Sequence, residues 1–230
     1  MPSLKGGWQL PIAPYHDKTG GMMNRNSLFV LGAAILLAAC NGPQGGASGS
    51  ADQGNLAGAN IGGPFTLTDQ DGARKSWSDF NGKYRLVYFG YSYCPDVCPV
   101  DLQLIAQGFR LFEKRAPERA AKLQPIFITL DPERDTPQVL KNYVSAFDPH
   151  LIGLTGTPEE IAAVAKKFVV VYNKETPKGS TDYLVSHSRT PFLFGPQGEP
   201  ITLMPVDDPA TGAQEGTPEE IAQTLDRWVK

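Results

Sequence analysis

The chain has 230 residues, of which 41% are hydrophobic, and a formal net charge of −3. It carries no basic stripe, and this excludes nucleic acid as an expected partner. It contains three cysteines, and an odd number outside the cytosol means that one of them needs a separate explanation.

The N-terminal region resembles a bacterial lipoprotein signal peptide. Arg25 precedes an almost wholly apolar run over residues 28–39, which ends in small residues followed by Cys40. The run is too short for an ordinary membrane span. We therefore expect residues 1–39 to be a leader and signal peptide that is cut before Cys40, with lipid attached to Cys40. The alternative is an uncleaved anchor with an incidental cysteine.

The leader is unusually long, and the folded region follows a polar spacer. Residues 1–21 show no signal character, so we expect the natural start at Met22 or Met23. Residues 40–60 contain the expected lipidated cysteine and a stretch rich in Gly, Ser, Ala and Gln, which is typical of a flexible tether. Residues 61–230 are long enough for one domain with an adequate core.

In the folded region, predicted strands alternate with predicted helices. In chain order, the sequence predicts a strand over residues 64–68, a turn over 69–72, a buried strand over 85–90, a helix over 99–115, a second buried strand over 124–130, helices over 137–147 and from 157, strands over 168–172, 183–187 and 192–194, a hairpin turn over 195–198 and a last helix from 217. This order predicts a thioredoxin-like α/β sandwich, in which helices flank a central mixed sheet.

Two cysteines, Cys94 and Cys98, lie between the first buried strand and the helix that follows it. A helix N-terminus favours the thiolate over the thiol. The Cys-x-x-x-Cys spacing is one residue wider than that of a standard disulfide oxidoreductase and suits two sulfurs that share a metal. Soft thiolate ligands select copper(I), zinc or iron–sulfur, and two cysteines are too few for a closed zinc site. A plain structural disulfide is the alternative in an oxidising compartment.

A third ligand would decide between these interpretations. Of the three histidines, His16 lies in the leader, His150 follows a helix, and His187 ends the predicted strand over residues 183–187. That strand precedes the hairpin, whose end lies beside the cysteine loop in a thioredoxin-like sheet, so His187 is the candidate ligand. A single histidine is by itself a weak signal. Met204 is the only methionine of the expected mature chain, which argues against a methionine-rich copper surface.

Three motifs together are similar to those of the Sco/SenC family of copper chaperones. They are Tyr-Cys-Pro-Asp-Val-Cys-Pro at residues 93–99, Asp-Pro-Glu-Arg-Asp-Thr-Pro at 131–137 and Val-Ser-His-Ser at 185–188. The resemblance covers roughly residues 62–230, and the combination is far more specific than any one motif alone.

The resemblance implies a thioredoxin-like domain that binds a copper ion through Cys94, Cys98 and His187. It also implies delivery of copper to the dinuclear copper centre of cytochrome c oxidase, with the copper-bearing subunit or another copper chaperone as partner. Some family members instead keep a partner's cysteines reduced, which uses Cys94 and Cys98 as a redox pair that forms a disulfide. Asp131 would lie near the site and support it electrostatically. Family analogy places the anchored protein at a bacterial membrane, facing the periplasm.

Two positions depart from the family pattern. The family often has an acidic residue just before the histidine, where this chain has Ser186. Thr190-Pro191 occupies a position that resembles that of the cis-proline facing the cysteine pair in thioredoxins, where many family members have no proline. Pro191 therefore adds weight to thiol–disulfide exchange.

Three functions compete on this fold. Copper delivery by ligand exchange needs both cysteines and His187, and it turns over no substrate, so the protein would not be an enzyme. A thiol–disulfide oxidoreductase needs both cysteines but not His187. A peroxide-consuming enzyme ranks last, because Val87 and Tyr91 occupy the matching positions of the peroxiredoxin motif Pro-x-x-x-Thr-x-x-Cys. We expect copper delivery, with redox work as a companion or an alternative.

Overall fold

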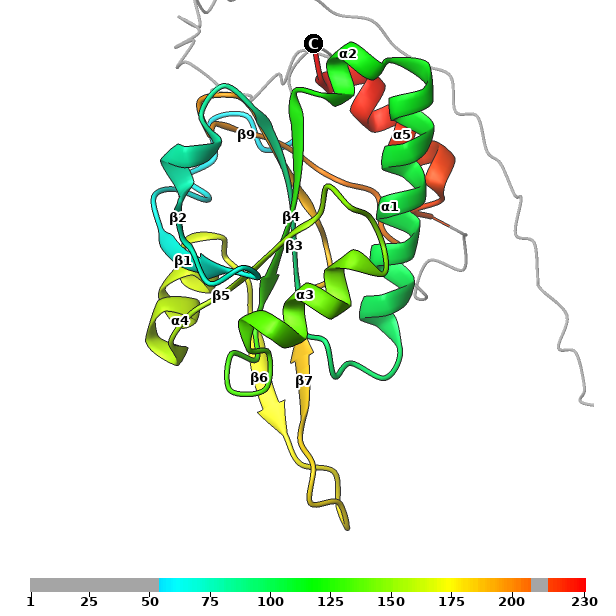
Figure 1. Cartoon of the computed structure of the whole chain (residues 1–230). Helices are drawn as coiled ribbons and strands as arrows, with labels where there is room; N and C mark the ends of the chain where they lie inside the picture. The colour runs from blue at the N-terminus through cyan, green and yellow to red at the C-terminus, as the bar shows by residue number, and fades with distance from the viewer. Residues whose placement is uncertain (1–53, 208–214) are drawn as a thin grey trace, which may run out of the picture. The chain divides into compact units, whose positions relative to one another are not determined.

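The computed structural model describes residues 54–207 and 215–230 (Figure 1). The predictions for the leader, the signal peptide and lipidated Cys40 lie outside these residues. None of the helices within the described ranges has the length and apolar character needed to cross a membrane.

The described residues form strands that alternate with helices, as the sequence predicted. The elements are β1 (Thr66–Asp69), β2 (Arg74–Ser76), the short 3₁₀ helix η1 (Trp77–Phe80), β3 (Tyr84–Gly90), α1 (Val97–Arg115), α2 (Pro117–Ala120), β4 (Leu123–Thr129), α3 (Pro137–Ser145), β5 (Ile152–Thr155), α4 (Pro158–Lys167), β6 (Tyr172–Glu175), β7 (Leu184–His187), β8 (Phe192–Phe194), β9 (Pro200–Leu203) and α5 (Pro218–Trp228).

Seven of these strands form one mixed sheet in the order β2-β1-β5-β4-β3-β8-β9. Strand β3 pairs parallel to β4 and antiparallel to β8. Figure 1 shows α1 and α5 together on one side of this sheet and α4 on the other. The predicted α/β sandwich with a central mixed sheet is therefore confirmed.

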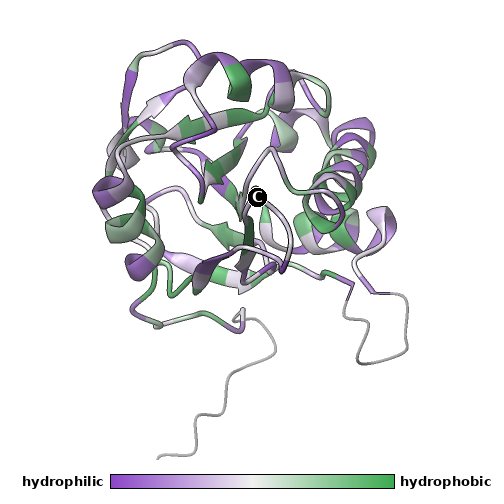
Figure 2. Ribbon diagram, turned by 90° about the horizontal axis from the view of Figure 1, so that it is seen from below, coloured by the Kyte–Doolittle hydropathy of each residue, from purple (hydrophilic) through white to green (hydrophobic). Residues whose placement is uncertain are grey.

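Strand β3 is buried along its whole length, as its continuous apolar run predicted. Successive side chains of a strand point to opposite faces. Tyr88 points toward α1, where its hydroxyl donates to Asp101 at 2.8 Å. Phe89 points to the other face and packs against Phe168, with ring centroids 5.2 Å apart. Figure 2 accordingly shows apolar residues on the strands and on the inner sides of the helices.

The ends of β3 and β4 determine where the functional loops emerge. The two strands are parallel and in register, with Gly90 opposite Thr129. The backbone N–H of Leu130 donates to the carbonyl of Gly90 at 2.7 Å. The loop after β3, which carries Cys94, therefore lies beside the loop after β4, which carries Asp131.

Helix starts agree closely with the sequence. Thr136, Thr157 and Thr217 are the N-caps of α3, α4 and α5, and each side-chain oxygen accepts from the backbone N–H three residues later, with proline in the first turn. Helix α1 begins at Val97, two residues before the predicted start, so Cys98 lies in its first turn.

The predicted strand over residues 168–172 is wrong. Phe168 is the C-cap of α4, Val169 has a φ of +55°, and β6 begins only at Tyr172. Phe168 is fully buried and packs against the rings of Trp77 and Phe194. Its apolar character therefore reflects the core rather than a strand. The predicted strand over residues 183–187 exists as β7, but it pairs with β6 in a separate two-stranded ribbon.

Ordered contacts begin before residue 61, where the sequence placed the start of the folded region. The backbone N–H of Leu56 donates to the carbonyl of Ile201 at 3.1 Å, and the side chain of Asn55 accepts from the N–H of Leu203 at 2.9 Å. Residues just before the predicted boundary thus bond to β9.

Candidate metal centre

The two cysteines lie where β3 passes into α1. Cys94 is half-buried in the connecting loop, and Cys98 is fully buried. Both are free thiols, and the backbone N–H of Cys98 donates to the sulfur of Cys94 at 3.4 Å. Gly90 leaves the space that Cys98 occupies, because a Cβ at this position would lie 3.2 Å from the Cys98 sulfur.

His187, at the end of β7, lies next to this pair. Its Nε2 atom is 3.2 Å from the Cys98 sulfur, and its Nδ1 atom is 2.9 Å from the backbone carbonyl of Ser188. A carbonyl oxygen only accepts hydrogen bonds, so Nδ1 of the ring carries a hydrogen. In the neutral imidazole, Nε2 then presents its lone pair toward Cys98, which is the tautomer that a metal-binding histidine needs.

Two tyrosines hold the imidazole in place. The rings of Tyr88 and Tyr91 pack edge-on against His187, with centroid distances of 6.4 Å and 6.2 Å. Both tyrosines are almost completely buried. The orientation of the ring is therefore fixed by packing as well as by its hydrogen bond to Ser188.

The two sulfurs differ in protonation. A hydrogen bond from Cys98, together with those from the backbone N–H groups of Asp96 and Cys98, lowers the pKa of the Cys94 thiol to about 5. The hydrogen bond to Cys94 and burial raise the pKa of the Cys98 thiol. At neutral pH, Cys94 is a thiolate, whereas Cys98 stays protonated. The acceptors near the Cys98 hydrogen are the sulfur of Cys94 and Nε2 of His187.

Asp135 fixes the start of the cysteine loop. Its carboxylate accepts from the backbone N–H of Ser92 at 3.0 Å, from the Ser92 hydroxyl and from the Thr129 hydroxyl at 2.5 Å. The side chain is fully buried, and burial raises the pKa of this carboxyl. The sequence analysis did not identify this contact, because it joins residues that lie 43 positions apart in the chain.

Asp131 is also fully buried, but its contacts lie on the side of the β6–β7 ribbon. Its carboxylate accepts from the guanidinium of Arg134 and from the hydroxyl of Tyr183 at 2.6 Å, and Nζ of Lys174 lies 3.9 Å away. Tyr183 immediately precedes β7. Asp131 therefore attaches the ribbon that carries His187 to the loop after β4. Its predicted electrostatic support of the metal site stays a prediction.

A carboxylate does lie near the position where the family pattern has an acidic residue. Glu175, on the neighbouring strand β6, accepts a hydrogen bond from the hydroxyl of Ser186 at 3.0 Å. Ser186 directly precedes His187. The sequence could not indicate Glu175, because strand pairing in the ribbon brings together residues that lie eleven positions apart.

The peptide bond before Pro191 is trans, as are all others within the described residues. Pro191 lies just before β8, and its carbonyl accepts from the N–H of Met204, just after β9, at 2.8 Å. Pro191 therefore does not match the cis-proline of thioredoxins, and it no longer adds weight to thiol–disulfide exchange.

The donor atoms suit a soft metal ion, although they are not yet spaced as ligands. Among the described residues, no group of three or more His, Cys, Asp or Glu side chains is arranged to hold a metal as it stands. Tetrahedral bonds of about 2.3 Å to sulfur and about 2.0 Å to nitrogen separate the two donors by about 3.5 Å. The Cys98 to His187 distance of 3.2 Å needs to widen by only a few tenths of an ångström. Two sulfurs and one imidazole favour copper(I) or zinc.

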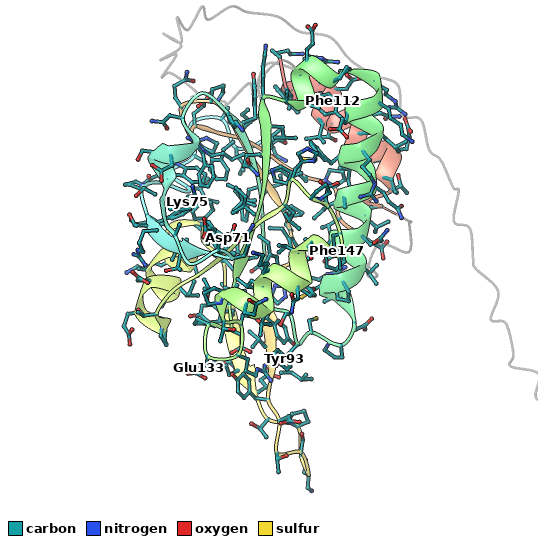
Figure 3. The ribbon with its side chains drawn as sticks, in the orientation of Figure 1. Asp71, Lys75, Tyr93, Phe112, Glu133 and Phe147 are labelled. Carbon is teal, nitrogen blue, oxygen red and sulfur yellow. The ribbon has the colours of Figure 1, made fainter. Side chains whose placement is uncertain are left out.

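Exposed apolar side chains gather in the segments that surround these donors. In the described part of the chain, the large hydrophobic residues that are exposed are Tyr93, Val100, Val169, Val171 and Leu184. They lie in the cysteine loop, the first turn of α1, the segment before β6 and strand β7. We call them the apolar rim. Figure 3 shows Tyr93 at the end of the molecule where the ribbon begins.

Comparisons with known proteins agree with this geometry. The family described as SCO1/SenC matches residues 53–229. The chain is 43% identical over 139 residues to the human mitochondrial SCO1 homolog, covering 60% of this chain and 46% of that protein. It is 45% identical over 141 residues to protein SenC of Rhodobacter capsulatus, covering 61% of this chain and 62% of that protein. The chain thus spans about half the length of the mitochondrial relative.

A solved structure shares the fold as well. It is the copper-bound ScoI of Bradyrhizobium japonicum, which is 42% identical, with a TM-score of 0.63, and the match covers 73% of this chain and 99% of that chain. The likeness confirms the predicted thioredoxin-like class.

Proposed function

The chain belongs to the SCO1/SenC family, and on that premise we propose that it binds a copper ion through Cys94, Cys98 and His187 and passes the ion to a partner protein. The observation that carries the proposal is the position of His187. Its Nε2 atom lies 3.2 Å from the Cys98 sulfur while Nδ1 is occupied by a carbonyl. A similar protein has been solved with copper bound.

Copper capture follows from the protonation of the three donors. Cys94 is already a thiolate and Nε2 of His187 already carries no proton, so both can bind the ion without losing a proton. Cys98 is a thiol whose hydrogen must leave as the metal binds. Metal binding therefore releases about one proton, and metal–ligand bonds replace the hydrogen bonds of Cys98.

Release by ligand exchange is favoured by the unequal burial of the sulfurs. Cys94 is half-buried while Cys98 is fully buried. An incoming thiolate of the partner would displace Cys94 first, while Cys98 and His187 still hold the ion. The apolar rim around the donors is typical of a surface that binds another protein. The proposed partner is the copper-bearing subunit of cytochrome c oxidase or another copper chaperone.

Thiol–disulfide exchange is a second candidate, favoured by the lowered pKa of Cys94. In that reaction the Cys94 thiolate attacks a partner's disulfide and forms a mixed disulfide, releasing one partner thiolate. Cys98 then loses its proton and attacks the Cys94 sulfur. The products are a Cys94–Cys98 disulfide and a partner dithiol, so two electrons pass to the partner. This pathway does not use His187.

We also propose a lipid anchor at Cys40 and a location on a bacterial membrane, facing the periplasm. The support is the signal-like sequence before Cys40 and the similarity to a bacterial SenC protein. A Cys40→Ala variant should move from the membrane fraction to the soluble fraction. A variant that stays with the membrane would contradict the anchor.

Copper titration of matched variants tests the site. The reduced protein should bind one copper per chain with a sulfur-to-metal charge-transfer absorption, and Cys94→Ser, Cys98→Ser and His187→Ala should each weaken binding. His150→Ala is the control, because His150 is exposed and pairs with Asp148 instead. Equal copper binding by His187→Ala and wild type would refute the site assignment. Retained reductase activity in His187→Ala would then favour the redox function.

A further inference from the structure

An ion pair between a buried aspartate and a partly exposed arginine lies beside the metal centre. Asp101 in α1 is 3% exposed. Its two carboxylate oxygens accept from Nη2 and Nε of Arg189 at 2.7 Å and 3.1 Å. Two parallel contacts between a guanidinium and a carboxylate fix the orientation of both groups as well as their distance.

The pair connects the two halves of the centre. Asp101 lies one helical turn after Cys98, and Arg189 lies two residues after His187. Tyr88 adds a second connection, since its hydroxyl donates to Asp101 at 2.8 Å and its ring packs against the imidazole of His187. The carboxylate is thus linked to His187 both along the chain and through a packed side chain.

The strand that carries His187 needs such a connection. Strand β7 pairs only with β6 among the described strands, in a two-stranded ribbon outside the main sheet. A two-stranded hairpin is marginally stable in water by itself. Main-sheet hydrogen bonds resume only at β8, which begins at Phe192. The ladder of the main sheet therefore does not fix the distance from His187 to Cys98.

We infer that Asp101 and Arg189 are positioning residues that hold His187 at the Cys98 sulfur, an inference that rests on the copper site proposed above. Neither residue binds the metal in this arrangement. Their fork-shaped pair holds the chain just after His187 against the helix that contains Cys98. Loss of Arg189 would leave the buried Asp101 carboxylate without its counterpart, and loss of either partner would free the ribbon end to move.

The variants Asp101→Asn and Arg189→Gln test the inference. Each should weaken copper binding by about 10- to 100-fold, the range for partners that orient a metal ligand. Each should also shift the charge-transfer spectrum toward that of His187→Ala. Arg189→Lys keeps the charge but loses the fork, so its effect should be smaller. The double variant Asp101→Asn with Arg189→Gln should lose no more affinity than either single variant.

Asp148→Asn is the matched control. Asp148 is 4% exposed and pairs, at 3.3 Å, with Arg110 of α1, the helix that also carries Asp101. Replacing it removes a buried carboxylate of the same kind with no link to His187. The control should keep the wild-type copper affinity and spectrum. Wild-type copper binding by Asp101→Asn and Arg189→Gln, or an equal loss in all variants including the control, would overturn the inference.

The metal-free protein supplies an independent readout. The backbone N–H of Ser188 donates to the carbonyl of Val171 at 2.9 Å, so its hydrogen exchange reports the order of the ribbon next to His187. Asp101→Asn should speed this exchange several-fold relative to Asp148→Asn. If the wild-type chain bound no copper, the proposed function would fail, whereas this exchange would still decide whether the pair holds the ribbon. Equal exchange in the two variants would overturn the inference.

Discussion

At the scale of single residues, the tautomer of His187 and the ionisation of Cys94 make the centre ready for a soft metal. One ring nitrogen is bonded to a backbone carbonyl and the other faces the Cys98 sulfur. The Cys94 sulfur receives hydrogen bonds that stabilise its thiolate. These contacts exist without metal, so little reorganisation is needed when copper arrives.

The pKa of Cys94 predicts how its reactivity depends on pH. The thiolate is the reactive form, and a lowered pKa keeps it populated in mildly acidic solution. In the reduced, metal-free Cys98→Ala variant, alkylation of Cys94 should titrate at a higher pH than in wild type, because the largest stabilising hydrogen bond is gone. In wild type, the alkylation rate should stay level from pH 8 to pH 6 and halve near a pKa of about 5. Half-reaction near pH 8.5, the usual thiol value, would contradict this.

Gly90 predicts a steric effect on the same centre. A methyl group there would lie 3.0 Å from the Phe127 ring and 3.2 Å from both Tyr88 and the Cys98 sulfur. Gly90→Ala should therefore displace Cys98, cost about 1–3 kcal/mol of unfolding free energy, and weaken copper binding. Thermal unfolding and copper titration measure the two effects. Wild-type copper affinity in Gly90→Ala would show that the centre tolerates this crowding.

At the scale of elements, the aspartates of one motif hold two separate segments. Asp135 bonds to the cysteine loop, and Asp131 bonds to Arg134 and to Tyr183, which lies at the hairpin end of the ribbon just before β7. The loop after β4 therefore joins both parts of the centre. This explains why the motif at residues 131–137 accompanies the cysteine motif.

Asp131→Asn should loosen the ribbon and destabilise the protein. The substitution removes a buried negative charge from Arg134, so we expect a loss of about 1–3 kcal/mol in the free energy of unfolding by urea. Lys141→Gln serves as the control, because its pair with Asp71 is exposed on both sides and should contribute less than about 1 kcal/mol. Equal effects of the two substitutions would show that Asp131 does not hold the ribbon.

Short sequence patterns were enough to predict the strands and helices that neighbouring residues define. The buried run of β3 and the threonine–proline starts of α3, α4 and α5 were predicted within a few residues. The residues of the predicted strand at 168–172 were misread because their apolar side chains belong partly to the core and partly to the rim. The partners Glu175 and Arg189 were missed because strand pairing and helix packing are non-local. His187 was selected as candidate ligand by its position at the end of a predicted strand, and the resemblance to the Sco/SenC motifs then implied the same residue.

At the scale of the whole molecule, the donors and the apolar rim lie at the same end of the sheet. Figure 1 shows the β6–β7 ribbon extending beyond the body of the domain at this end, whereas α5 lies toward the opposite end. A partner that approaches the half-buried Cys94 would therefore contact the rim. Copper binding and copper transfer should then respond to different substitutions.

Val171→Glu should separate binding from transfer. Val171 is 72% exposed and belongs to the rim, so a charge there should slow copper transfer to the oxidase copper-binding domain by roughly tenfold, while copper affinity stays unchanged. Gln223→Glu makes the same charge change on α5 and should leave the transfer rate unaltered. Stopped-flow absorption measures both rates. Equal transfer rates for the two variants would exclude the rim as the transfer surface.

The identity of the copper ligands is the most direct test of the central claim. X-ray absorption at the copper edge of the loaded protein reports which atoms surround the ion. The arrangement of Cys94, Cys98 and His187 predicts two sulfur neighbours and one imidazole nitrogen, with the nitrogen lost in His187→Ala. A copper environment without imidazole in the wild-type protein, or one unchanged by His187→Ala, would contradict the account.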